Sequence, residues 1–130
     1  MKHRIIFETG LQPKPEPHEI SAAVILAEYF ASDVTFLRRG IDSTADFVIK
    51  NVVWELKSPR GNSKHTIQNN LRDAGAQSIN VIVDLGRSKM STEQAISKIR
   101  YFLANGNRHI KKLLLITRSG EVIDIYQKMK

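Results

Sequence analysis

Residues 44–59 read TADFVIKNVVWELKSP, and this stretch decides the fold. Apolar residues dominate on both sides of Lys50 and Asn51. This pattern predicts two short strands, over 46–49 and 52–56, joined by a tight turn at these two residues.

Two acids and a lysine interrupt these otherwise apolar strands. Strand alternation places Glu55 and Lys57 on one face, and Asp46 falls near Glu55 across the hairpin. Two carboxylates and a lysine form a set that suits phosphodiester cleavage, because the acids can hold a divalent cation and the lysine can stabilise charge on phosphorus. Spacing alone leaves a second interpretation open, namely a solvent-facing ion pair between Glu55 and Lys57.

Hydrophobic periodicity predicts the elements on either side of the hairpin. They are a helix from Pro17 or Glu19 to Ala31, a strand over 34–38, a helix over 67–78, a buried parallel strand over 79–85, a helix from Ser91 opened by a capping box with Gln94, and strands over 113–117 and 122–126. The order α-β-β-β-α-β-α-β-β indicates an α/β (α+β) fold with a mixed central sheet flanked by helices. Residues 1–18 are expected to be an extended N-terminal lead-in, and 19–130 a single domain.

Composition narrows the classes of function. The 130 residues carry a formal net charge of +7, which attracts polyanions such as nucleic acid. There is no cysteine, so thiolate chemistry is excluded, and the four histidines have no zinc-site spacing. No apolar run approaches the roughly 20 residues that cross a bilayer, and the N-terminus lacks the pattern of an export signal, so we expect no membrane contact and delivery by something else.

The central motif resembles a known nuclease superfamily. Asp46, eight intervening residues and then Glu55-Leu-Lys57 resemble the PD-(D/E)xK pattern, with Ala45 where that pattern has proline. More closely, HEISAA at 18–23 together with WELKSP at 54–59 looks like the C-terminal tRNA-nuclease domain of CdiA contact-dependent growth-inhibition toxins. The resemblance runs from about Glu19 to the final hairpin.

This resemblance implies a restriction-endonuclease-like fold and a set of site residues. The expected catalytic residues are Asp46, Glu55, Lys57 and Glu19; the expected substrate-binding residues are Arg60, Lys64, His65 and Gln77. Asp46 and Glu55 would also bind a divalent cation, Mg²⁺ or Zn²⁺, if the enzyme is metal-dependent. Metal-independent cleavage stays open, because RNA carries its own nucleophile in the 2'-hydroxyl group.

The resemblance also implies substrates, partners and a place of action. The favoured activity is cleavage of RNA, most of all tRNA, in the bacterial cytoplasm after delivery as part of a secreted toxin. The implied protein partners are a cognate immunity protein and elongation factor Tu. Two other functions remain: a metal-dependent DNase of the same superfamily, and a non-catalytic nucleic-acid-binding module.

Overall fold

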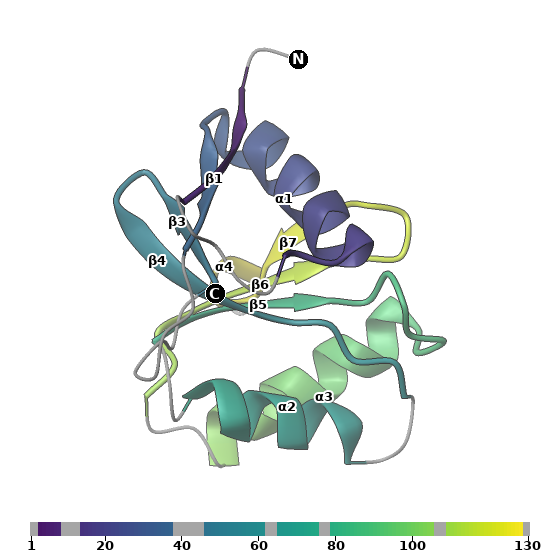
Figure 1. Cartoon of the computed structure of the whole chain (residues 1–130). Helices are drawn as coiled ribbons and strands as arrows, with labels where there is room; N and C mark the ends of the chain where they lie inside the picture. Colours follow the sequence, from purple (N-terminus) through teal and green to yellow (C-terminus); the bar gives the residue numbers. More distant parts are fainter. Residues whose placement is uncertain are drawn as a thin grey trace.

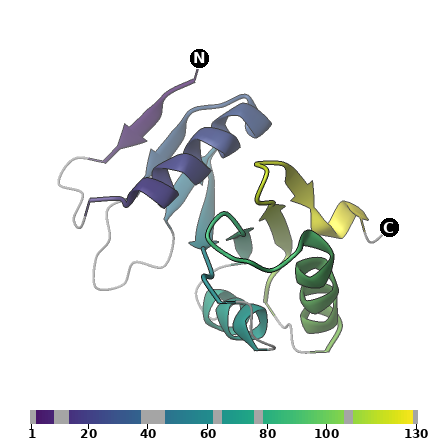
Figure 2. The same ribbon diagram turned by 90° about the vertical axis from the view of Figure 1, so that its right-hand side faces the viewer.

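A mixed β-sheet runs through the chain, with α1 on one face and α2 and α3 on the other (Figures 1 and 2). The computed structural model describes residues 3–8, 14–37, 46–61, 65–75, 79–105 and 109–128. Within them, the elements are β1 (Ile5–Phe7), α1 (Pro17–Phe30), β2 (Val34–Phe36), β3 (Phe47–Ile49), β4 (Val52–Lys57), α2 (Thr66–Gly75), β5 (Asn80–Asp84), α3 (Thr92–Asn105), β6 (Lys112–Ile116), β7 (Val122–Asp124) and α4 (Ile125–Lys128).

The strands lie in the sheet in the same order as in the chain. β1 pairs with β2 in parallel, whereas β2, β3 and β4 form an antiparallel meander. β4, β5 and β6 are parallel, and β7 returns antiparallel to β6. α2 connects β4 to β5, and α3 connects β5 to β6. Both connections are crossovers between parallel strands that step toward the same edge of the sheet, so their common right-handedness places both helices on the same face.

The predicted mixed sheet with flanking helices is confirmed, and the predicted order holds from α1 to β7. Two elements were missed. β1 lies in the residues expected to be an extended lead-in, where three residues give too short a pattern to recognise. The strand predicted over 122–126 is wrong at its end, because the Asp124 carboxylate accepts a hydrogen bond from Gln127 N at 3.2 Å and α4 begins at Ile125.

The predicted turn at Lys50 and Asn51 is confirmed. Both residues have positive φ, 50° and 67°, and the flanking residues Ile49 and Val52 pair directly. Two left-handed residues in a two-residue loop are the geometry of a type I′ hairpin turn, which fits the natural twist of the strands. This turn fixes the register of the hairpin.

The sheet separates two hydrophobic cores. On one face, α1 packs on the sheet through Ala23 and Leu26, together with Trp54 and Leu56 of β4. On the other face, α2 and α3 pack on the sheet, and their cluster includes Leu71 and Ile99 with residues of β5 and β6. β5 is buried along its whole length, as predicted for a parallel strand at the centre of a sheet.

The capping box predicted at Ser91 and Gln94 is confirmed. The capping box that opens α3 is present, with Gln94 N donating to Ser91 Oγ at 3.1 Å and Ser91 N donating to Gln94 Oε1 at 3.2 Å. Among the described residues, no helix has the length and apolar character needed to cross a membrane.

The turn offers a test of the hairpin. A β-branched residue tolerates positive φ poorly, so Asn51→Val is expected to lower the free energy of unfolding by about 1 to 2 kcal/mol, whereas Asn51→Gly keeps or raises it. Urea denaturation of both variants and the wild type measures the difference. Equal stability of the valine and glycine variants would contradict the left-handed turn.

Candidate active site

Asp46 stands just before β3 and is tied to β4 by two hydrogen bonds. Its backbone N–H donates to Trp54 O at 2.9 Å, and its carboxylate Oδ2 accepts from Leu56 N at 2.8 Å. The type I′ turn sets this pairing, since Phe47 then lies opposite Trp54. The carboxylate of Asp46 is therefore held against the strand that carries the other two residues.

Glu55 and Lys57 point to the face of the sheet that α2 and α3 cover. Their partners in register on β5 are Val81 and Val83, which belong to the core cluster beneath those helices. Lys57 Nζ lies 3.6 Å from Glu55 Oε2. Glu55 is only 7% exposed, so the pair is not the solvent-facing ion pair that strand alternation alone would also allow.

The surroundings of Glu55 raise its pKa from 4.5 to about 7. Burial is the main cause, because it disfavours the charged form, and the neighbouring Asp46 carboxylate adds to it. The Lys57 ammonium acts in the opposite direction. At neutral pH Glu55 therefore exists in both protonation states, which is the condition for a side chain that accepts and returns protons during a reaction.

The structure brings Asp46, Glu55 and Lys57 together as predicted, but it places Glu19 elsewhere. Glu19 lies in the first turn of α1, where its carboxylate accepts a hydrogen bond from Glu16 N at 2.8 Å and completes a capping box. α1 covers the face of the sheet opposite Glu55 and Lys57. The described contact of Glu19 stabilises the start of the helix.

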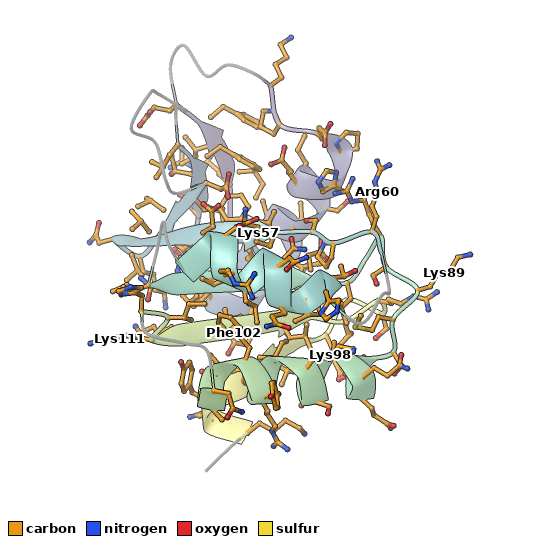
Figure 3. The ribbon with its side chains drawn as sticks, turned by 90° about the horizontal axis from the view of Figure 1, so that it is seen from below. Lys57, Arg60, Lys89, Lys98, Phe102 and Lys111 are labelled. Atoms are coloured by element: carbon orange, nitrogen blue, oxygen red, sulfur yellow. The ribbon has the colours of Figure 1, made fainter. Side chains whose placement is uncertain are left out.

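Two of the four predicted substrate-binding residues, Arg60 and His65, lie within the described residues. Arg60 is exposed on the segment after β4 (Figure 3). His65 is exposed at the start of α2 and lines a groove of about 470 Å³ with Lys98 and Phe102 of α3. Lys64 and Gln77 lie outside the described residues.

The structure adds polar residues that sequence reasoning did not select. Asp84 ends β5, is 6% exposed, and has its pKa raised by burial. Arg87 Nη2 donates to Ser58 O, directly after Lys57, at 2.8 Å. The signal in the sequence was Asp84 itself, an acid within the otherwise largely apolar run 79–85, because acidic side chains are rarely buried unless they are paired.

The two carboxylates suit a hard divalent cation that keeps water or substrate as its other ligands, rather than one enclosed entirely by protein side chains. The described part of the chain contains no group of three or more side chains that could hold a metal ion. Magnesium commonly binds through one or two carboxylates, with water and substrate phosphate completing its shell. Two adjacent carboxyl groups, one with a raised pKa, are a donor set that a cation would satisfy.

A comparison with known protein families identifies the family of this chain. Residues 43–122, which include all three clustered residues, match the family described as "Contact-dependent growth inhibition CdiA C-terminal domain". The chain belongs to this family. No curated protein matches it.

This CdiA C-terminal domain shares its fold with one chain of a solved complex. It is similar to "CdiA-CT/CdiI toxin and immunity complex from Burkholderia pseudomallei", with a TM-score of 0.63 and 20% sequence identity over 94% of this chain and 97% of that chain. At this identity the likeness concerns the fold, and it agrees with the mixed sheet and helices described above.

The buried carboxyl of this CdiA C-terminal domain predicts how stability depends on pH. Folding raises the pKa of Glu55, so its contribution is fully present below pH 4.5 and is lost as the pH rises through about 7. Glu55→Gln is therefore expected to raise Tm relative to wild type at pH 8, and to do so much less at pH 4.

Thermal unfolding across this pH range measures the difference, with Glu28→Gln as a control for loss of an exposed acid from α1. A Tm difference between Glu55→Gln and wild type that does not change with pH would show that Glu55 ionises normally in the folded chain.

Proposed function

We propose that this CdiA C-terminal domain is a toxin nuclease that cleaves phosphodiester bonds in RNA, with tRNA as the favoured substrate. The observation that carries the proposal is the buried carboxyl of Glu55, which has a pKa of about 7 and lies between Asp46 and a lysine ammonium 3.6 Å away. A proton acceptor beside a fixed positive charge is what attack on a phosphodiester requires.

The roles of the three residues follow from their positions. Ionised Glu55 takes the proton from the attacking 2'-hydroxyl group, the O2'–P bond forms, the P–O5' bond breaks, and the departing 5' oxygen takes up a proton from solvent. Lys57 stabilises the negative charge that develops on the non-bridging phosphate oxygens. Asp46, fixed by Leu56 N, keeps the pKa of Glu55 high enough for proton transfer near neutral pH.

Asp46 and Glu55 are also the residues that would hold a divalent cation. When bound, Mg²⁺ or Zn²⁺ supplies Lewis-acid polarisation of the phosphate and lowers the pKa of its water. Such an enzyme could hydrolyse DNA as well as RNA, so a metal-dependent DNase is the second candidate. The third is a nucleic-acid-binding module without catalysis, which the complete set of two acids and a lysine disfavours.

The net charge and the family support the setting of this activity. A charge of +7 favours association with a polyanion. The similar solved structure is a toxin and immunity complex, which supports a cognate immunity protein for this chain. We propose that this partner covers the candidate active site. Action in the bacterial cytoplasm follows from a tRNA substrate, and elongation factor Tu is a proposed helper whose addition to the assay tests its role.

Replacing Lys57 tests the activity. Lys57→Ala is expected to reduce cleavage of total tRNA by about a hundredfold or more, since a group that stabilises transition-state charge is lost. Lys111→Ala removes an exposed lysine just before β6, at the opposite end of the molecule from Arg60, and should cleave like wild type (Figure 3). Circular dichroism should be the same in all three proteins and should show that each is folded at the assay temperature.

The same assay separates the candidate functions. The assay is repeated with duplex DNA, with single-stranded DNA and with a tRNA oligonucleotide that carries a 2'-deoxy residue at the cleavage position. Each substrate is tested with Mg²⁺, Zn²⁺ or chelator. Loss of cleavage at the deoxy position supports attack by the 2'-hydroxyl group. Cleavage of DNA alone, abolished by chelator, would favour the DNase, and cutting of neither polymer would leave only the binding module.

Glu55 should also set the pH dependence of the rate. Because its ionised form is the proton acceptor, the cleavage rate is expected to rise with pH up to about 7 and to level off above it. Glu55→Gln should abolish this rise together with nearly all activity. A wild-type profile that is flat between pH 5 and 8 would exclude Glu55 as the base.

A further inference from the structure

A cavity with several charged lining residues lies near the candidate active site, on the other face of the sheet. It has a volume of about 240 Å³ and is lined by the first half of α1 and by the ends of β5 and β6, including His18, Asp84, Arg87 and Arg118. Ligands of open α/β sheets bind outside the carboxyl ends of parallel strands, and β4, β5 and β6 all end here. The volume is below the roughly 300 Å³ at which pockets for whole drug-sized ligands begin, so it suits part of a larger molecule.

The charges of this cavity favour an anion. Asp84 is the acid that lines it, and its Oδ1 accepts a hydrogen bond from Gly86 N at 2.9 Å. Asp84 lies within the electrostatic reach of both His18 and Arg87, which it balances. Arg118 follows β6 and is exposed, so the lining has two guanidinium groups against one carboxylate.

Arg87, one of the residues that line the cavity, uses only part of its hydrogen-bonding capacity within the described residues. A guanidinium group has five N–H donors in a planar fork that matches phosphate oxygens. Arg87 uses Nη2 for Ser58 O, and its buried Nε has no acceptor within the described residues. Its orientation is fixed by the backbone carbonyl of Ser58, so less side-chain entropy is lost when an anion arrives.

The cavity is also connected to the proposed chemistry. Ser58, which Arg87 contacts, directly follows Lys57 on the strand of the candidate active site. β4 and β6 are two strand spacings apart, about 10 Å, so an extended polynucleotide at Lys57 can reach Arg118 around the end of the sheet. Figure 3 shows Arg60 and Lys89 toward one end of the molecule and Lys111 toward the opposite end.

We infer that this cavity binds a backbone phosphate of the RNA strand, one or more nucleotides from the bond that is cut, with Arg118 and Arg87 as its ligands. The inference rests on the proposed RNA substrate. Asp84 does not contact the phosphate, and its charge acts on the Arg87 guanidinium over a longer range. A nucleotide anchored here would present the neighbouring phosphodiester to Glu55 and Lys57.

The test uses the full chain with Lys57→Ala, so that RNA is bound and not cleaved. Binding of a labelled single-stranded RNA is followed by fluorescence anisotropy over a series of salt concentrations. Arg118→Ala is expected to weaken binding about tenfold and to reduce the slope of log K against log salt by about 0.7, the share of one phosphate contact. Arg118→Lys should restore the slope but only part of the affinity.

Lys111→Ala in the same background is the matched control, because both residues are exposed cations that flank β6 at opposite ends. It should change the affinity less than about twofold. Equal losses in the two variants would show a general charge effect and overturn the phosphate site, and so would an Arg118→Ala protein that binds like its parent or a parent that binds no RNA.

Cleavage of RNA by the protein with Lys57 intact is measured separately and decides the proposed function. If it cuts RNA and Arg118→Ala leaves binding unchanged, only the phosphate site fails. If it cuts no RNA but the arginine variant loses affinity and slope, the site stands as a binding site and the nuclease proposal fails.

Discussion

The hydrogen bond from Leu56 N to the Asp46 carboxylate joins the two strands on which the candidate site depends. It spans 2.8 Å and lies where β3 gives way to the preceding segment. Because it fixes a side chain to a backbone amide of β4, it determines where the second carboxyl stands relative to Glu55. The same strand then directs Leu56 into one core and Glu55 with Lys57 toward the other, so one strand supports the hydrophobic core and the candidate chemistry at once.

This arrangement has an energetic cost. Glu55 occupies a position on β4 where the parallel neighbour β5 contributes valines to a fully apolar cluster. A buried ion pair often contributes less to stability than apolar residues of the same size, because both charges lose their water. Burial also raises the pKa of the Glu55 carboxyl. The loss of stability and the proposed reactivity of Glu55 therefore have the same cause.

Local chemistry made much of this structure predictable. The turn at Lys50 and Asn51, the capping box before α3 and the buried run of β5 each carry their signal within a few neighbouring residues. The meeting of Asp46 and Glu55 was also predictable, since a two-residue turn leaves little freedom in the pairing across it.

The remainder depended on contacts between distant segments. Which face of the sheet α1 covers cannot be derived from its own periodicity, so the position of Glu19 relative to Glu55 could not be predicted. Asp84 and Arg87 acquire their surroundings from α1 and from the residue after β4, which are far away in the chain. The α4 helix was missed because Asp124 acts as a cap only once β7 has ended there.

The strands lie in the sheet in the same order as in the chain, and this order affects how the protein folds. Each strand pairs with the one that precedes it in the chain, but the parallel pairs join segments separated by a helix, as where Ile5 pairs with Val34 and Asn80 with Lys112. Closing a short loop costs less entropy than closing a long one, so the β3–β4 and β6–β7 hairpins are expected to form before the parallel pairs. The β3–β4 hairpin can therefore bring its three charged residues together early, whereas the burial that raises the pKa of Glu55 must wait for β5 and the helices on that face.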